Sequence, residues 1–133
     1  MRALSEEPHE NVLRLDAVYE SDNSIYVVME NISGGQFYNL IKKKGGPFPN
    51  PETRQLMLGL LRALSHMHTR RYMHRDLKPE NVMMREDGVT PVLVDFGLAT
   101  NADLERYLFF RCGTPGYVAP EIIELTESKH VEP

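Results

Sequence analysis

The chain has 133 residues, of which 41% are hydrophobic, and its 15 basic and 19 acidic residues give a formal net charge of −4. Such a length is typical of one domain, and the acidic balance argues against nucleic acid or an anionic membrane as the main partner. A single cysteine excludes an intrachain disulfide, and no apolar run approaches the roughly 18 residues of a membrane span. The N-terminus lacks the pattern of a signal peptide. These features predict a cytoplasmic, intracellular protein.

Two paired strands and a short helix are predicted in the first third of the chain. Residues 12–19 and 25–29 are rich in branched and aromatic side chains, and Ser-Asp-Asn-Ser at 21–24 has the composition of a hairpin turn. The helix is indicated by apolar residues at helical spacing, Phe37, Leu40 and Ile41. Three lysines, 42–44, precede Gly45 and are interpreted as a solvated helix end rather than a phosphate-binding patch.

A longer helix is predicted from Asn50, a favourable cap residue followed by Pro51 at the first helical position, to about Arg70. Its buried stripe consists of apolar residues at helical spacing, Leu56, Leu60, Leu64 and Met67. We expect this stripe to pack partly against elements outside the chain and to leave an exposed apolar face. Gly59 is interpreted as a mild weakness of the helix.

The most informative stretch is His-Arg-Asp-Leu-Lys-Pro-Glu-Asn at 74–81, because it contains the groups that phosphoryl transfer needs. Asp76 can accept a proton from an incoming hydroxyl, and Asn81 can ligate a metal that carries nucleotide phosphates. Lys78 lies between them and can steady the moving charge. Alone, the stretch is suggestive of this chemistry.

Two further motifs follow in a fixed order. Asp-Phe-Gly at 95–97 comes nineteen residues after Asp76, at the end of the second of two short predicted strands, 82–84 and 92–94. Gly-Thr-Pro-Gly-Tyr-Val-Ala-Pro-Glu occupies 113–121. This trio resembles the catalytic half of a protein kinase. The sequence Lys-Pro-Glu-Asn at 78–81 is similar to the one that serine/threonine kinases carry in this loop. The broader sequence pattern is similar to that of their calcium/calmodulin-dependent-like and cyclic-nucleotide-dependent-like branches.

The resemblance runs from about His9 to Glu121 and implies an α+β, two-lobed kinase fold that is only partly present. Residues 1–32 would be small-lobe strands and the hinge, and 33–133 a large-lobe portion with the catalytic loop and activation segment. The glycine-rich loop G-x-G-x-x-G and the ATP-anchoring lysine do not occur in the sequence, which stops twelve residues after Glu121. We therefore expect a fragment with little or no activity alone.

The resemblance assigns the catalytic roles. Asp76 matches the catalytic base, and Lys78 should contact the transferring phosphoryl group. Asn81 and Asp95 match the ligands of Mg²⁺, whose preference for hard oxygen donors they suit. Thr114 is expected to bridge Asp76 and Lys78. The implied cofactors are ATP and Mg²⁺.

The same resemblance places the adenine pocket. Met29 falls at its back, and the backbone of Glu30 to Ile32 at the hinge that binds the purine edge in relatives. Met83 should form the floor beneath the ring. Glu80 keeps a carboxylate nearby, whereas neutral Gln36 stands where many basophilic relatives carry Glu, which puts a strong preference for substrate arginine in doubt.

Several other side chains are expected to have structural or regulatory roles. His74 is expected to pack under Phe96, and His66 and His68, at i and i+2, lie on different helix faces and are not assigned to a metal. Arg75 normally implies control by a phosphate on the activation segment. The position that usually accepts the phosphate is occupied by Phe110. Other hydroxyl groups of the segment belong to Thr100 and Tyr107, and Glu105 carries a fixed negative charge. Activation without a phosphate at that position is therefore predicted, with Glu105 as a partial anionic partner for Arg75. The alternative is activation by modification of Thr100 or Tyr107.

The function implied by the resemblance is transfer of the ATP γ-phosphoryl group to Ser or Thr of protein substrates, with no regulatory partner assigned. One alternative is a non-catalytic pseudokinase or binding fragment, since the glycine loop and lysine are absent from the sequence. A small-molecule phosphotransferase is another, but it would not be expected to carry the 113–121 segment.

Overall fold

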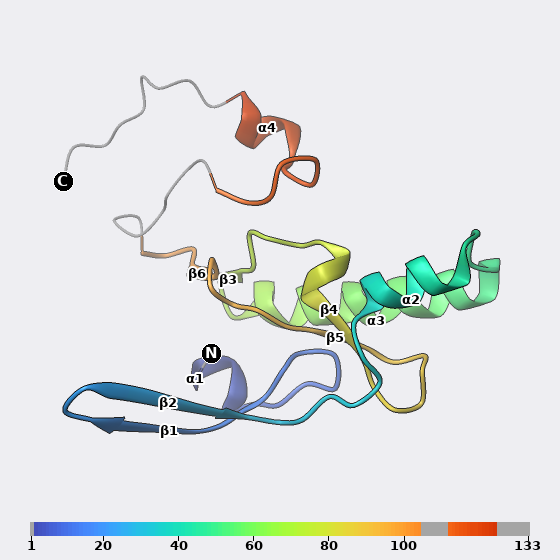
Figure 1. Cartoon of the computed structure of the whole chain (residues 1–133). Helices are drawn as coiled ribbons and strands as arrows, with labels where there is room; N and C mark the ends of the chain where they lie inside the picture. The colour runs from blue at the N-terminus through green and yellow to red at the C-terminus, as the bar shows by residue number, and fades with distance from the viewer. Residues whose placement is uncertain (1, 105–111, 125–133) are drawn as a thin grey trace.

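The computed structural model describes residues 2–104 and 112–124. Figure 1 shows a long hairpin on one side of a body of helices and short strands, with α4 on the opposite side. The elements in chain order are α1 (Arg2–Ser5), β1 (Leu15–Ser21), β2 (Ser24–Met29), α2 (Phe37–Lys44), α3 (Asn50–Thr69), β3 (Tyr72–Met73), a 3₁₀ turn (Pro79–Asn81), β4 (Val82–Met84), β5 (Pro91–Leu93), β6 (Thr100–Asn101) and α4 (Pro120–Ile123).

The predicted hairpin is confirmed, with a later start than expected. β1 and β2 pair antiparallel, and the Ser21–Ser24 pair closes the turn. Val12 does not belong to the hairpin, because it forms a parallel bridge with Leu93 of β5 instead. Every residue of β2 is exposed, so the hairpin stands outside the core.

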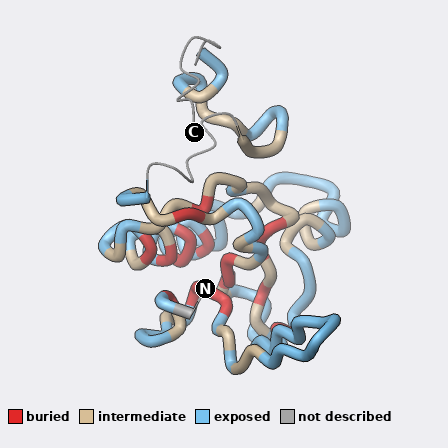
Figure 2. Tube along the Cα trace, turned by 90° about the vertical axis from the view of Figure 1, so that its left-hand side faces the viewer, coloured by how far each residue is buried: buried red, intermediate tan, exposed pale blue. Residues whose placement is uncertain are grey.

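The core forms between α3, β4, β5 and the N-terminal segment, and Figure 2 shows the buried residues gathered there. The expectation that the α3 stripe packs outside the chain is wrong for Leu56 and Leu60, which are buried within it. Their neighbours come from four segments, and include Leu4, Val12, Val82, Met84 and Leu93. The apolar side chains that α3 exposes are on its other face, at Met57, Leu58 and Leu61.

The helix boundaries follow the sequence signals closely. α2 ends at Gly45, whose left-handed φ of 63° lets its N–H reach the Ile41 carbonyl. α3 starts one residue earlier than predicted, with Pro49 rather than Asn50 as the cap. The Pro49 carbonyl accepts hydrogen bonds from the backbone N–H and the hydroxyl of Thr53, and no side chain caps the start of the helix.

Gly59 is a close-approach position, which corrects its reading as a weakness. A Cβ at Gly59 would lie 2.6 Å from Cγ of Pro91, so the absence of a side chain lets α3 lie against β5. Asn11 secures the same junction, because its Nδ2 donates to the Pro91 carbonyl at 2.7 Å.

The strands β4 and β5 form the platform of the site. They pair antiparallel, and Asp87 closes the turn between them by accepting hydrogen bonds from the backbone of Val89 and Thr90. Residues 11–13 run beside β5, and Gln36 bridges Met83 of β4 on the other side. The platform therefore joins four chain segments. Among residues 2–104 and 112–124, no helix has both the length and the apolar character of a membrane span.

Candidate functional site

Asp76, Lys78 and Thr114 meet in one hydrogen-bonded group. Lys78 Nζ lies 2.8 Å from Asp76 Oδ2. The Thr114 hydroxyl donates to Asp76 Oδ1 at 2.6 Å and accepts from Lys78 Nζ at 2.7 Å. Thr114 thus bridges the two residues as the sequence predicted, although it lies 36 and 38 residues further along the chain.

Asn81 and Asp95 lie at the same end of the β4–β5 ladder. The Val94 N–H donates to the Asn81 carbonyl at 2.9 Å, so Asp95 directly follows the residue paired with Asn81. Asn81 Nδ2 donates to both the carbonyl and Oδ2 of Asp76, at 2.9 and 3.0 Å. This orientation directs the amide nitrogen to Asp76 and leaves the amide oxygen Oδ1, the atom expected from the sequence to ligate a metal, for other partners.

Two site residues have left-handed backbone, which is uncommon for residues other than glycine. Arg75 has φ of 66° and Asp95 has φ of 58°. Each is held there by its own side chain, since Arg75 Nε donates to the Leu98 carbonyl and Asp95 Oδ1 accepts the Gly97 N–H. The strain therefore falls on the residues that flank or make the site.

His74 connects the 74–81 loop to the segment that carries Asp95. Its Nδ1 accepts the N–H of Asp76, so Nε2 carries the proton donated to the Val94 carbonyl at 3.0 Å. Its ring packs on Phe96 with centroids 5.3 Å apart, as predicted. Burial lowers the pKa of His74, although the bond to Val94 opposes this shift.

The hydrogen bonds among Asp76, Lys78 and Thr114 favour the charged forms of Asp76 and Lys78. Desolvation raises the pKa of Asp76, but hydrogen bonds from Lys78, Thr114 and Asn81 outweigh it and hold that pKa below its ordinary value. The hydrogen bond to Asp76 raises the pKa of Lys78. At neutral pH, Asp76 is therefore a carboxylate and Lys78 an ammonium.

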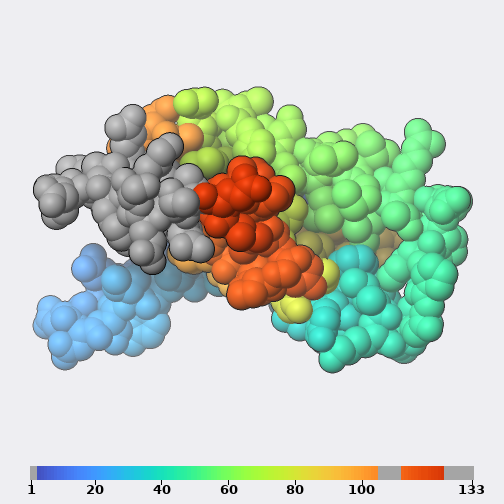
Figure 3. Space-filling view, turned by 90° about the horizontal axis from the view of Figure 1, so that it is seen from above, coloured from blue at the N-terminus to red at the C-terminus, as the bar shows by residue number. Residues whose placement is uncertain are grey.

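Thr114 reaches the site because residues 112–119 lie across it. Figure 3 shows this segment in orange on the face that also carries yellow residues of the 74–81 loop. Gly113 has φ of 119°, and a Cβ there would meet the Arg75 carbonyl at 3.1 Å. A glycine before Thr114 thus permits close approach to the 74–81 loop.

Two of the residues predicted for the adenine pocket, Ile32 and Met83, pack together at the platform. Ile32 is buried with Leu13 and Val92, and half-buried Met83 packs against this cluster. Met29 is exposed at the end of β2. The Glu80 Oε2 oxygen is buried and has no hydrogen-bond partner among the described residues.

Only one of the residues predicted to have a regulatory role in the activation segment, Thr100, lies within the described residues. Thr100 is buried in β6, where it pairs with Met73. Glu105, Tyr107 and Phe110 lie outside the described residues, so the prediction about the activation segment stays a prediction.

The side-chain oxygens of Asn81 and Asp95 suit a metal ion that takes its remaining ligands from another molecule. Among residues 2–104 and 112–124, no cluster of three or more His, Cys, Asp or Glu side chains could form a metal cage. The amide oxygen of Asn81 and the exposed carboxylate of Asp95 are two hard donors at one place. Mg²⁺ commonly takes one or two protein ligands and completes its shell with phosphates and water, so these residues fit it.

Sequence reasoning missed Arg85, which links three segments through its side chain. No local pattern could have revealed it, since Arg85 opens a turn and its partners lie 55 and 75 residues away.

Comparisons with known proteins agree with this geometry. The protein kinase domain model matches residues 1–133. Serine/threonine-protein kinase DCLK3 of Homo sapiens is 43% identical over 118 residues, covering 86% of this chain and 18% of its own length. Calcium/calmodulin-dependent protein kinase cmkB of Emericella nidulans is 37% identical over 129 residues, covering 94% and 31%. A probable myosin light chain kinase of Dictyostelium discoideum is 37% identical over 118 residues, covering 86% and 33%.

This chain thus spans between 18 and 33% of the length of these three relatives. The relatives are similar serine/threonine kinases, including one of the calcium/calmodulin-dependent type. The family model covers the whole sequence, and the α+β structure has the small sheets and helices of part of a two-lobed kinase. The chain therefore belongs to the protein kinase domain family.

Proposed function

We propose that this chain provides the catalytic loop and part of the nucleotide pocket of a serine/threonine protein kinase, which transfers the ATP γ-phosphoryl group to Ser or Thr of protein substrates. Residues 1–32 are assigned to small-lobe strands and hinge, and 33–133 to the large lobe. The observation that carries the proposal is the Thr114 hydroxyl between Asp76 and Lys78. This bond attaches the segment expected to dock a peptide directly to the catalytic residues, which favours a protein over a small-molecule acceptor.

Asp76 is proposed to orient the acceptor hydroxyl. A carboxylate has about four acceptor positions, and Asn81, Thr114 and Lys78 use three of them. The remaining position can receive the substrate O–H. Because the pKa of Asp76 is lowered, its main work is alignment, with proton removal late in the reaction.

Lys78 is proposed to contact the transferring phosphoryl group, where its fixed charge favours the transition state. Asn81 Oδ1 and Asp95 are proposed to hold Mg²⁺. When bound, Mg²⁺ neutralises charge on the nucleotide phosphates. The purine edge would meet the backbone of Glu30 to Ile32, above Met83. Within the described residues, no backbone hydrogen bond uses the Glu30 carbonyl or the Ile32 N–H, which supports this role.

A cytoplasmic location is part of the proposal, because ATP is the phosphoryl donor and the chain's single cysteine is typical of a reducing compartment.

The test uses the full-length protein with Mg²⁺, labelled ATP and a Ser/Thr peptide library. Asp76→Asn and Asp95→Asn should each reduce transfer at least about 100-fold, the scale of losing a preorganised charged group. Asp22→Asn, in the exposed hairpin turn, is the matched control and should retain wild-type activity. Wild-type protein that binds Mg²⁺–ATP without transfer would favour the pseudokinase alternative.

A further inference from the structure

Arg85 is tied to three parts of the chain that the proposed nucleotide pocket needs. It follows β4, two residues after the proposed floor residue Met83. Its Nη1 donates to Glu30 Oε2 at 3.2 Å. Its Nε and Nη2 both donate to the Glu10 carbonyl, at 3.2 and 2.8 Å. The guanidinium therefore links β4, the hinge and the 9–11 loop.

Glu30 passes this connection on to the hairpin. Its Oε1 accepts the Arg14 N–H at 2.9 Å, and its own N–H donates to the Arg14 carbonyl at 3.1 Å. Residues 14 and 30 are thereby fixed to each other at the base of the hairpin. Through Glu30, the Arg85 side chain is therefore connected by hydrogen bonds to the base of the hairpin.

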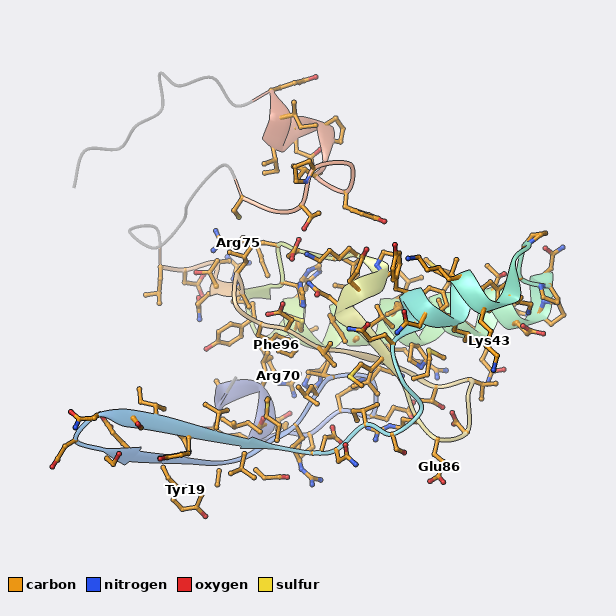
Figure 4. The ribbon with its side chains drawn as sticks, viewed as in Figure 1. Tyr19, Lys43, Arg70, Arg75, Glu86 and Phe96 are labelled. Carbon is orange, nitrogen blue, oxygen red and sulfur yellow. The ribbon has the colours of Figure 1, made fainter. Side chains whose placement is uncertain are left out.

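The anchor at Arg85 is rigid. Its N–H donates to the Thr90 carbonyl at 2.9 Å, and its carbonyl accepts the Gly88 N–H at 2.9 Å. Asp87 holds the same turn through three bonds to Val89 and Thr90. Figure 4 shows the next side chain, Glu86, directed away from the protein at this turn, whereas the printed bonds of Arg85 turn it toward the hinge.

The Arg85–Glu30 ion pair is partly shielded from water. Exposure of the side chains is 33% for Arg85 and 15% for Glu30, and among the described ion pairs only Asp76–Lys78 has both partners more shielded. A shielded pair with extra hydrogen bonds contributes more to positioning than an exposed surface pair. A guanidinium also suits two acceptors at fixed angles better than an ammonium.

We propose that Arg85 is a positioning residue for nucleotide binding, which acts by bracing the Glu30–Ile32 hinge against the strand that carries Met83. This inference rests on the proposed function. Backbone contacts from Gly35 and Gln36 to β4 already fix residues 35–36. The Arg85 side chain extends that attachment to residue 30, where the purine edge is proposed to bind.

The test compares four forms of the full-length protein: wild type, Arg85→Ala, Arg85→Lys and the control Arg62→Ala. Arg62 is matched because it also faces Glu10, but through an exposed carboxylate at 3.9 Å. KM for ATP and kcat are measured with one peptide, direct binding of Mg²⁺–ATP is measured separately, and hydrogen exchange is followed at residues 10–14 and 30–32.

Arg85→Ala should raise KM and the dissociation constant for ATP about tenfold. It should change kcat less than about twofold, because the lost interaction is equally strong in the ground state and the transition state. Exchange at residues 10–14 and 30–32 should quicken. Arg85→Lys should recover part of the affinity, and Arg62→Ala should behave as wild type. Adding Glu30→Gln to Arg85→Ala should cost little more, because the two residues form one brace.

The outcomes separate the two proposals. A wild-type protein that binds no Mg²⁺–ATP overturns the proposed function and this inference with it. Wild-type binding with unchanged affinity in Arg85→Ala overturns only the brace. A higher kcat at constant KM in Arg85→Ala also overturns it, because the pair would then restrain catalysis rather than position the nucleotide.

Discussion

Thr114 shows how one hydroxyl can organise a charged pair. It donates to the carboxylate of Asp76 and accepts from the ammonium of Lys78, so its removal leaves both charges with one fewer partner. Both charged side chains are largely shielded from water, at 11 and 20% exposure. The geometry of the pair therefore depends on a residue that carries no charge.

Replacing Thr114 by Val should lower kcat about 10- to 100-fold, because Val is nearly isosteric but cannot hydrogen-bond, and one lost bond to a charged group is worth about 1.5–3 kcal/mol. Thr114→Ser should recover most of the rate. Steady-state kinetics with peptide and ATP measure both variants. Equal losses in Val and Ser would mean that the methyl group, not the hydroxyl, is needed.

His74 should make stability depend on pH. Burial lowers its pKa in the folded protein below the ordinary 6.5. In the window below 6.5, the unfolded chain binds a proton that the folded chain does not, so acidification favours unfolding. One such proton corresponds to a slope of at most about 1.4 kcal/mol per pH unit.

Urea midpoints of the full-length protein should therefore fall between pH 7.5 and 5.5, and His74→Gln should reduce the slope. Some slope should remain, because burial also lowers the pKa of His9 and His66. An identical slope in wild type and His74→Gln would show that His74 takes no part in this linkage.

At the scale of elements, the contact of α3 with β5 decides how the platform sits. The Pro91 ring can lie against α3 because Gly59 has no Cβ, and Asn11 adds a hydrogen bond to the Pro91 carbonyl. β5 ends at Leu93, two residues before Asp95, so this contact holds α3 against the strand that precedes a proposed metal ligand.

Gly59→Ala should destabilise the full-length protein by about 1–3 kcal/mol, the usual cost of overpacking. At an exposed helix position a Gly→Ala change would stabilise the protein by about 1 kcal/mol. The sign of the change in the free energy of unfolding therefore shows whether Gly59 is a packing contact. The control is Gly46→Ala, where a Cβ meets nothing within 4 Å and the effect should stay within about 0.5 kcal/mol. Chemical denaturation measures both, and a stabilised Gly59→Ala would contradict the packing argument.

At the scale of the whole molecule, two apolar surfaces lack cover within the described residues. One is the hairpin, where Tyr19, Ile25 and Tyr26 are at least 60% exposed, and Figure 4 shows Tyr19 directed into solvent. The other is the outer face of α3, at Met57, Leu58 and Leu61. The surfaces differ from the Leu56–Leu64 stripe that the sequence suggested.

These 133 residues expressed alone should bind a hydrophobic dye and aggregate, because they bury too little apolar surface to offset their chain entropy. Ile25→Thr combined with Tyr26→Thr should reduce dye binding while keeping strand-forming residues. Dye fluorescence and light scattering measure this. A sharp, cooperative thermal transition of a soluble monomer would contradict the expectation.

The sequence by itself determined most of the elements and pointed to the residues that are proposed to be catalytic. Periodicity and turn residues located the hairpin, α2, α3 and the β4–β5 pair to within a few residues, because these signals are local. The order of the motifs around Asp76, Asp95 and Thr114 was enough to indicate the family, and the fold and the domain-model match confirmed it.

Only the tertiary structure decided which surfaces meet. It buried Leu56 and Leu60 inside the chain, made Gly59 a contact rather than a weakness, and gave Arg85 partners 55 and 75 residues away. The physical reason is that helical or strand periodicity shows which side of an element is apolar but not what covers it. A side chain such as Arg85 acquires its role from distant backbone and carboxylate oxygens, which no local pattern contains.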